Sequence, residues 1–482
     1  MSELLTVKAI RDAIAEGTVT AEEIVKNSLA RIDAEDAEIG AFLEVFHTRA
    51  LEKAREIDAM KVRGDVLPRL AGVPVAIKDN MLLMGEKASA GSKILQDYTS
   101  AYSATVVARL EEAGAIIVGR TNMDEFAMGS STETSAFQKT RNPWDTSRVP
   151  GGSSGGSCAA VAAGFVAAAL GSDTGGSIRQ PAALCGIVGL KPTYGRVSRY
   201  GIVALASSLD QVGPFAHTVE DAMLIMEVIE GRDEHDATSV ELDSKPVAEL
   251  LEPSMKGLRV GVPKEYFIDG MDPEVRARVE EAIEVFRANG AEIIDISLPL
   301  SPYALPTYYI IQPAEASSNL ARFDGMRYGT RAPGALEDSY LTARSEGFGL
   351  EVKRRIMLGS FILSAGYYDA FYKKSLAVRN ALRKEFDEAF KRVDVIISPT
   401  TPGTAWKLGE KFDDPIAMYL ADVFTTPANI AGLPGISIPC GFANDLPVGL
   451  QLQAMPFDEM TMYKAAAAYQ VLTDWHTKVP QT

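Results

Sequence analysis

Short apolar runs alternate with helical segments from about residue 70 onward, and this alternation restricts the fold more than any other feature. Gly72–Ile77, Gly114–Gly119 and Val166–Leu170 have the length and composition of buried strands, and Ala104–Ala113 has the pattern of a helix. Strands that alternate with helices are typical of α/β proteins, whose functional residues lie where strands end. The sequence therefore predicts an α/β fold with a site beyond these strand ends.

The remaining chain supplies further elements of both kinds. The first 60 residues are predicted to be helical, with a capping box at Thr20–Glu23. A helix is predicted to begin at Asp272-Pro273 and to end at Asn289-Gly290, and residues 349–392 are also predicted to be helical. Further strands are predicted at Gly257–Pro263, Asp394–Ser398, Gly435–Pro439 and Val448–Gln453. One large sheet fed by both halves of the chain is as plausible from this pattern as two domains.

Charge and cysteine content exclude several classes of protein. The formal net charge is −16, so most of the surface should repel nucleic acid, and a partner would have to supply any RNA contact. Three widely spaced cysteines fit reduced thiols and a cytoplasmic location better than a disulfide framework. No apolar run reaches the ~18 residues of a membrane span, and no Cys-x-x-Cys or His-x-x-x-His spacing indicates zinc. We expect no metal and no membrane association.

The segment Val149–Ser157 carries the densest chemical signal. Its glycines allow positive φ and close approach of the backbone, so the serines between them can be held rigidly. A flexible linker is the alternative, but the run leads into the alanine-rich segment Cys158–Val166, which indicates packing. Ser153 and Ser154 each also match the nucleophile elbow of α/β-hydrolases, which needs a later acid and histidine. The later histidines lie in polar or terminal stretches and fit that reading poorly: His217, His235 and His476.

A second glycine-serine segment, Gly171–Arg179, follows the strand that ends near Leu170. Successive amides of Thr174, Gly175 and Gly176 can form a nest of N–H donors suited to an oxyanion, with Ser177 placed to attack. Taken alone, Gly-Gly-Ser is usually a turn.

Lys78 follows the first predicted strand directly. Most such lysines are exposed, but desolvation there would lower the pKa of the amine and leave a neutral base.

In this order and spacing, the three segments resemble the amidase signature family. The matching residues are Ile77–Asp79, Gly151–Ser157 and Asp173–Thr193. The resemblance implies a large central mixed β-sheet covered by helices on both faces. It also implies a single domain over residues 1–482, with an N-terminal helical layer over about 1–65, a catalytic core over about 66–215, and a remainder that completes the sheet and substrate pocket.

The resemblance also implies roles for individual residues. Ser177 matches the acylated nucleophile, Lys78 the base, and Ser153 a bridging serine that follows a cis peptide bond. Ser154 and Ser157 would support them. The oxyanion hole would be formed by the amides of Thr174, Gly175, Gly176 and Ser177. Cys158 stands where the family pattern has alanine, which puts no role in doubt.

Further segments are similar to the A subunits of bacterial tRNA-dependent amidotransferases, within the same family. They include Gly129–Ser135, Asn142–Asp145, Tyr194–Gly201, Lys353–Gly359 and Ala421–Pro427. Such subunits hydrolyse glutamine and pass ammonia to a B subunit that amidates Glu-tRNA(Gln) or Asp-tRNA(Asn), while a small C subunit clasps the two. ATP and Mg²⁺ would then belong to the B subunit, and this chain would need no cofactor.

Glutamine is a zwitterion, so its pocket needs both a cation and an anion. Arg355 and Asp422 match the family positions with those roles. A solvated helix charge is the alternative for Arg355, and either Arg354 or Arg355 could face the pocket. Further pocket residues implied by the resemblance are Gly129, Ser130, Tyr308, Tyr309 and Gln312. Two other functions stay open: a stand-alone amidase of small amides and a binding subunit without catalysis.

Overall fold

The computed structural model describes residues 6–242 and 251–480, and its centre is one eleven-stranded sheet. The strands follow the order β1-β3-β2-β4-β6-β5-β10-β11-β9-β7-β8. Their bounds are β1 (Phe42–Val45), β2 (Pro74–Lys78), β3 (Ile116–Thr121), β4 (Ala168–Asp173), β5 (Val188–Lys191), β6 (Gln211–Ala216), β7 (Arg259–Pro263), β8 (Glu292–Ile296), β9 (Val395–Pro399), β10 (Gly435–Ala443) and β11 (Leu446–Ala454). Both halves of the chain therefore build the same sheet.

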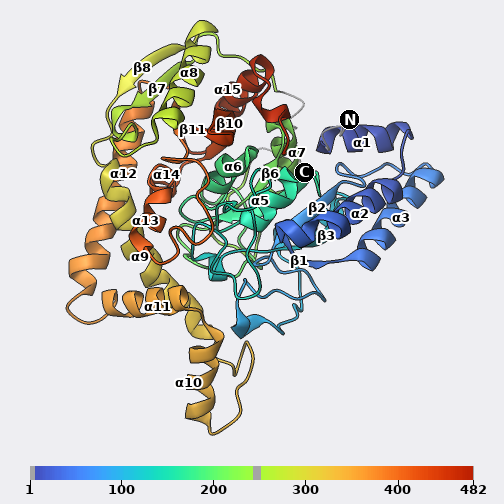
Figure 1. The fold of residues 1–482 in the computed structure, drawn as a ribbon, viewed down its shortest axis with the longest axis vertical. Helices are drawn as coiled ribbons and strands as arrows, with labels where there is room; N and C mark the ends of the chain where they lie inside the picture. The colour runs from blue at the N-terminus through green and yellow to red at the C-terminus, as the bar shows by residue number, and fades with distance from the viewer. Residues whose placement is uncertain (1–5, 243–250, 481–482) are drawn as a thin grey trace.

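Helices cover this sheet on both faces, as the resemblance implied (Figure 1). Every residue of β11 is buried, which requires cover on each side, and α6, α8 and α15 all contact β10 and β11. The helices are α1 (Val7–Glu16), α2 (Ala21–Ile39), α3 (His47–Arg63), α4 (Thr105–Glu112), α5 (Gly155–Ala162), α6 (Arg179–Cys185), α7 (Val219–Ile229), α8 (Pro273–Ala288), α9 (Ala304–Asn319), α10 (Leu336–Gly347), α11 (Leu350–Ile362), α12 (Lys374–Phe390), α13 (Pro415–Tyr419), α14 (Thr426–Ala431) and α15 (Glu459–Leu472).

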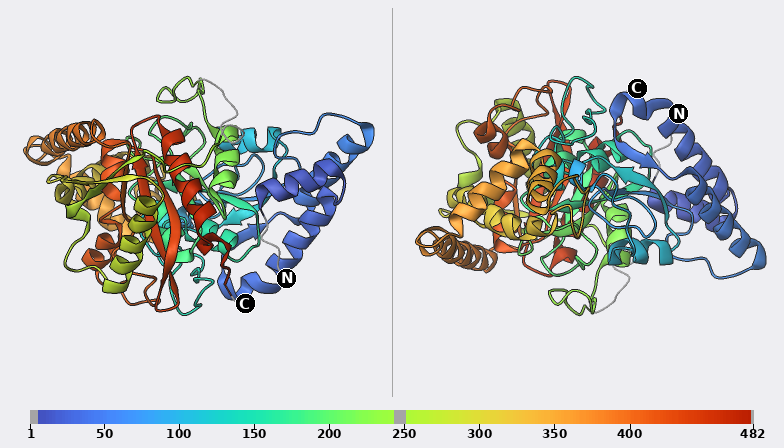
Figure 2. Two further views of the ribbon diagram at one scale, coloured as in Figure 1. Left: turned by 90° about the horizontal axis from the view of Figure 1, so that it is seen from above. Right: turned by 90° about the horizontal axis from the view of Figure 1, so that it is seen from below.

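The first three helices lie together at one end of the molecule, away from residues 300–400 (Figure 2). α2 begins with the predicted capping box: the Thr20 side chain accepts from the Glu23 amide, and the Glu23 carboxylate accepts from the Thr20 amide. α8 begins after Asp272, whose carboxylate accepts from the Glu274 amide, and ends at Asn289 as predicted. No helix in the described ranges is long and apolar enough to cross a membrane.

Two predictions of local structure are wrong. The first 60 residues are not all helical, because Phe42–Val45 forms β1 at the sheet edge and pairs antiparallel with β3. The helical run over 349–392 is interrupted between α11 and α12. Gly366 there has φ +88°, a left-handed conformation that ends an α-helix, and a π-helical turn follows at Tyr368–Lys373.

Three neighbouring parallel strands position the candidate site. β2 pairs in parallel with both β3 and β4, so the carboxyl ends of these strands meet at one edge. Lys78 is the last residue of β2 and Asp173 the last residue of β4. The loops that leave this edge are therefore the ones that carry the predicted chemistry.

Candidate active site

Lys78 is fully buried and surrounded by hydroxyl groups. Its Nζ lies 2.8 Å from Ser153 Oγ, 2.8 Å from Ser154 Oγ and 2.9 Å from Ser172 Oγ. Burial lowers the pKa of Lys78 to about 7, although nearby carboxylates oppose the shift. A large fraction of this amine is therefore neutral near neutral pH and available as a base.

The glycine-serine segment wraps closely around the buried carboxylate of Asp124. A Cβ on Gly152 would lie 2.1 Å from an Asp124 oxygen, so only glycine fits. The same carboxylate accepts from the amides of Thr132 and Thr134, which fixes the loop after Gly129. The Gly152–Ser153 peptide bond is cis. Asp124 thus joins the loop at Thr132 and Thr134 to the glycine-serine segment at Gly152.

Ser154 and Ser157 tie the start of α5 to the sheet. Ser154 Oγ donates to the Ser172 carbonyl over 3.1 Å, and Ser157 Oγ donates to the Leu170 carbonyl of β4 over 2.9 Å. These bonds hold Ser153, which precedes α5, against the end of β4.

Ser177 closes the turn that leaves β4. Its side chain is 7% exposed, and Ser177 Oγ makes no hydrogen bond to another described residue. The amides of Gly175, Gly176 and Ser177 likewise donate to no group in the described part of the chain, although all three residues are buried. Buried amides without a partner are uncommon, so this turn offers free donors to a ligand atom.

The turn is fixed from behind by a buried ion pair. The Arg179 guanidinium donates to both oxygens of Asp173 over 3.1 Å, and Asn429 donates to the same carboxylate over 2.7 Å. Thr425 Oγ1 donates to the Gly175 carbonyl over 2.8 Å. Burial alone would raise the pKa of Asp173, but Arg179, Lys191 and Asn429 together lower the pKa below its ordinary value. Residues far along the chain therefore hold the turn.

Arg355, and not Arg354, is the inward-facing arginine of α11. Arg355 is 3% exposed and donates to Glu351 and to Gln312, each over 2.8 Å. Its guanidinium also lies 5.2 Å from the ring centroid of Tyr309. Arg354 is exposed and pairs with the same Glu351.

Asp422 is buried with one oxygen open. Ser130 Oγ donates to Asp422 Oδ2 over 2.5 Å, whereas Oδ1 has no partner among the described residues. Gly176 packs against it, because a Cβ on that glycine would lie 2.9 Å from Oδ1. Burial raises the pKa of Asp422 to about 7, and a cation bound at Oδ1 would reverse that shift. The open carboxylate oxygen thus lies directly beside the Ser177 turn.

A cavity of about 290 Å³ lies next to Arg355. Its lining includes Gly129, Glu351, both Arg354 and Arg355, and Tyr419. Tyr308 packs against Gly175, and Tyr309 stacks on Tyr419 with 3.9 Å between ring centroids. Of the candidate residues, Gly129 and Arg355 line the cavity, whereas the catalytic residues and Asp422 do not.

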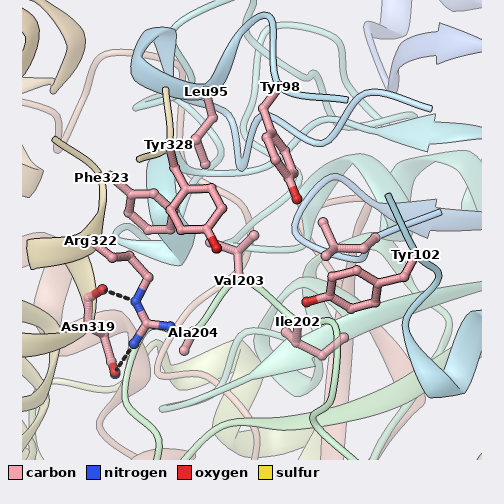
Figure 3. A pocket seen from close by; sticks show the side chains of 11 residues that line it. Leu95, Tyr98, Tyr102, Ile202, Val203, Ala204, Asn319, Arg322, Phe323 and Tyr328 are labelled. Atoms are coloured by element: carbon pink, nitrogen blue, oxygen red, sulfur yellow. Dashed lines mark hydrogen bonds between the residues drawn. The ribbon is translucent and has the colours of Figure 1, made fainter. Parts of the chain in front are cut away.

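A second cavity, of about 140 Å³, lies apart from the candidate residues. Figure 3 shows three tyrosines, Tyr98, Tyr102 and Tyr328, with their hydroxyls at this cavity, beside Arg322. The Arg322 guanidinium donates to the Asn319 carbonyl over 2.8 Å. No candidate residue named above lines it.

Two neighbours of Lys78 were missed by the sequence analysis. Ser172 accepts from Lys78, and Asn80 Nδ2 donates to the same Ser172 Oγ over 3.0 Å. A single polar residue in a buried strand carries no distinctive pattern. The sequence offers one indication of Ser172: it stands directly before the Asp173 turn in a buried strand, where a polar side chain needs a hydrogen-bond partner.

Histidines play no part in this arrangement. His47 contacts Asp33 and His235 contacts Asp233, in both cases away from the serines. Burial lowers the pKa of His217 to about 4. None of the four histidines, all within the described ranges, bonds to Ser153, Ser154 or Ser177.

Comparison with known proteins decides the family. Residues 23–462 match the family model described as Amidase. The chain belongs to the amidase family. This amidase is 56% identical to the A subunit of the glutamyl-tRNA(Gln) amidotransferase of Roseiflexus castenholzii, over 99% of this chain and 97% of that protein. It is 57% identical to the A subunit of the same enzyme from Koribacter versatilis, over 97% and 98% of the two chains.

Solved structures agree with the fold. The crystal structure of the A subunit of the glutamyl-tRNA(Gln) amidotransferase from Thermotoga maritima superposes with a TM-score of 0.82 at 44% identity. The match covers 98% of this amidase and 95% of that chain. The fold and the family resemblance predicted from sequence are therefore confirmed.

Proposed function

We propose that this amidase is the glutamine-hydrolysing subunit of a tRNA-dependent amidotransferase. One observation carries the proposal: a buried lysine–serine network lies beside a carboxylate with an open oxygen and a cavity lined by a buried arginine. A substrate that fits this site has an amide that a serine can attack, together with the carboxylate and the ammonium group of a free amino acid. Glutamine has all three groups, and the A-subunit relatives supply the biological setting.

Lys78 acts as the base, and its hydrogen bonds support one direction of proton transfer. A neutral amine has two N–H donors and one lone pair. Ser154 already donates its proton to the Ser172 carbonyl, and Ser172 Oγ already accepts from Asn80, so both hydroxyls suit the two donors. Ser153 is then the hydroxyl that donates to the lone pair of Lys78.

Ser177 Oγ attacks the amide carbon of glutamine. Its proton passes to Ser153 Oγ as the Ser153 proton passes to Lys78 Nζ, and the new C–O bond leaves the carbonyl oxygen negative. The amides of the turn, from Thr174, Gly175, Gly176 and Ser177, stabilise that oxygen by hydrogen bonds in a buried site. The relay then protonates the departing ammonia, and water cleaves the acyl-enzyme along the same route.

Arg355 and Asp422 hold the two charged groups of glutamine. The guanidinium binds the α-carboxylate as a planar fork, and Asp422 Oδ1 accepts from the α-ammonium. Ser130 orients Asp422, whereas Gly129 lets its loop approach Asp124, because a Cβ there would lie 2.4 Å from that carboxylate. Tyr309 stacks against the guanidinium and fixes its plane.

Partner chains would perform the rest of the reaction. ATP and Mg²⁺ would act on a B subunit that amidates Glu-tRNA(Gln), Asp-tRNA(Asn) or both, with a C subunit joining the two. The net charge of −16 supports this division, because tRNA contact is then not required of this surface. The assembly would work in the cytoplasm.

Ammonia release from L-glutamine tests the proposal, with the chain alone and with its co-purified partner chains and charged tRNA. We expect release that depends on Ser177 and increases in the assembled complex. Small aryl or peptide amides serve as the comparison. Hydrolysis of those amides with no hydrolysis of glutamine under either condition would identify a stand-alone amidase, and no hydrolysis of any amide would identify a binding subunit.

A further inference from the structure

Glu125 is a buried glutamate that does not belong to the catalytic groups described above. It is 2% exposed and lines the same 290 Å³ cavity as Arg355. Burial raises the pKa of Glu125 to about 7, although its hydrogen bonds and the charges of Lys353 and Lys93 oppose the shift. Burying a carboxylate is costly unless bound groups compensate, so the partners of Glu125 indicate its purpose.

The partners of Glu125 lie at the start of α11. The Gly349 amide donates to both carboxylate oxygens, over 2.9 Å to Oε2 and 3.1 Å to Oε1, and Ser92 Oγ donates to Oε1. Gly349 is the N-cap of α11 and has no side chain with which to cap the helix. A Cβ at this position would lie 2.2 Å from Glu125 Oε2, so only glycine allows this approach. Glu125 thus supplies the negative group that a helix N-terminus favours.

An aromatic contact fixes the same junction. Phe126 follows Glu125, and its ring centroid lies 5.5 Å from that of Phe348, which directly precedes Gly349. Phe126 has φ +49° and Ala127 has φ +60°, in the left-handed region that residues other than glycine rarely adopt. Backbone of this kind persists only where its surroundings fix it. The turn at Glu125 therefore holds the start of α11 through both a polar and an aromatic contact.

Asp124 and Glu125 are consecutive residues whose carboxylates contact different parts of the site. Asp124 packs against Gly152 of the glycine-serine segment, whereas Glu125 binds the start of α11. The Glu125 amide donates to Thr134 Oγ1, which in turn donates to Asp124 Oδ1. The catalytic glycine-serine segment and the helix that carries Arg355 are thus attached to the same turn.

The position of Arg355 depends on how α11 is held. Arg355 lies six residues after Gly349, which is about 9 Å along a helix that rises 1.5 Å per residue. Farther along, a Cβ on Gly359 would lie 1.9 Å from the Pro313 carbonyl, so the helix is pressed against α9 there. A helix held at both places has one position and one rotation. Movement at its N-terminus would therefore carry the guanidinium with it.

We propose that Glu125 is a positioning residue, whose ionised carboxylate holds the start of α11 so that Arg355 is placed for the α-carboxylate of glutamine. The inference rests on the proposed function, which supplies that ligand. Protonation of Glu125 weakens its bond to the Gly349 amide, because a charged acceptor binds an N–H more strongly than a neutral one. Glutamine affinity should therefore decline as the pH falls through the pKa of Glu125, about 7.

Other charged groups lie around Glu125 on neighbouring elements. Those that face it, adjoin it or line its cavity are Lys93, Asp124, Glu133, Asp413 and, on α11, Glu351, Lys353, Arg354 and Arg355. Lys78 and Asp422 also have a pKa of about 7 and take part in glutamine hydrolysis. All of these groups are present in a Glu125 variant as well. A ratio of variant to wild type at each pH therefore cancels their own titration.

The ratio of KM for glutamine between Glu125→Gln and the wild type tests the inference, measured on the chain with its co-purified partner chains. Glutamine at this position keeps the shape of the side chain and one acceptor oxygen but has no charge. We expect a ratio of about three to ten at about pH 8, with a smaller change in kcat. At about pH 6 the ratio should approach one, because wild-type Glu125 is then protonated too.

Glu133→Gln is the matched control. Glu133 lines the same cavity and is 4% exposed, but its carboxylate accepts from the Gly409 amide, over 2.8 Å, rather than from Gly349. Its KM ratio to the wild type should not change with pH. A Glu125→Gln ratio that stays near one at every pH would overturn the inference. So would a raised ratio that is the same at every pH, because the effect would then not come from the charge.

Hydrogen exchange separates failure of the inference from failure of the proposed function, because it needs no substrate. The Lys353 amide donates to the Gly349 carbonyl over 3.1 Å. In Glu125→Gln, this amide and its neighbours in α11 should exchange about threefold or more faster than in the wild type at about pH 8, and equally fast at about pH 6. Unchanged exchange in β10 and β11 shows that the variant is folded.

The two measurements together have distinct outcomes. If the wild type never hydrolyses glutamine but α11 responds in this way, the hold of Glu125 on α11 stands and the proposed function fails. If the exchange of α11 does not respond, the inference is overturned whether or not glutamine is hydrolysed.

Discussion

The buried amine of Lys78 makes the stability of the protein depend on pH in a predictable direction. Its pKa is about 7 in the folded chain, against an ordinary value of 10.5. Between these values the unfolded chain holds a proton that the folded chain has released, so the free energy of unfolding rises with pH by about 1.4 kcal/mol per pH unit. This contribution is present above the unfolded pKa and is lost as pH falls through the folded pKa.

Replacing Lys78 by methionine removes this titration. From about pH 7.5 to about pH 9.5, the wild type should gain roughly 2–3 kcal/mol of stability relative to Lys78→Met. Lys78→Met also loses the hydrogen bonds to the three serines. This loss changes the free energy of unfolding by an amount that does not depend on pH. The buried Lys191 titrates in both proteins, so its contribution cancels.

Urea unfolding of both proteins at the two pH values measures this change, and steady-state kinetics measures the activity. Glutamine hydrolysis should fall by about a hundredfold to ten-thousandfold in Lys78→Met, as for loss of a general base. A stability difference that stays constant over this pH range would show that Lys78 is charged when folded. The base assignment would then be refuted, whatever the activity.

Three further substitutions test other parts of the site. Arg355→Lys keeps the charge but loses the planar fork, so steady-state kinetics should show KM for glutamine about tenfold higher or more with a smaller change in kcat. A change confined to kcat would argue against carboxylate binding. Gly176→Ala places a methyl 2.2 Å from Thr425 Oγ1 at φ +149°, so kcat should fall about a hundredfold as the oxyanion donors shift; full activity would exclude this turn as the oxyanion hole. Arg179→Met leaves Asp173 buried and unpaired, and urea unfolding should show a loss of about 3–5 kcal/mol. A loss below about 1 kcal/mol would mean that the pair does not support the turn.

The candidate catalytic residues could be predicted because each lies in a contiguous motif. Ser153 and Ser177 are embedded in glycine-rich segments, and Lys78 follows an apolar strand directly. Their spacing along the chain carried the family resemblance. What the motifs could not reveal is the network between them. Ser172 has no distinctive sequence context, and it reaches Lys78 and Asn80 only because β2 pairs with β4.

Adjacent residues on a helix posed a different difficulty. Arg354 and Arg355 project about 100° apart, and sequence alone does not fix which side packs inward. The close contact of Gly359 with α9 fixes the rotation of α11, which buries Arg355 and leaves Arg354 exposed. β1 escaped prediction because four residues between two helices are too few to display a strand period.

The support of the Ser177 turn by Thr425 and Asn429 has a consequence for synthesis of the chain. Thr425 bonds to Gly175 across 250 positions, and Asn429 bonds to Asp173 across 256. A ribosome reaches the nucleophile long before it reaches these supports, and β10, next to β5 in the sheet, comes later still. A nascent chain thus acquires its serines early, but we expect the Ser177 turn to reach its supported geometry only after Thr425, Asn429 and β10 have been made.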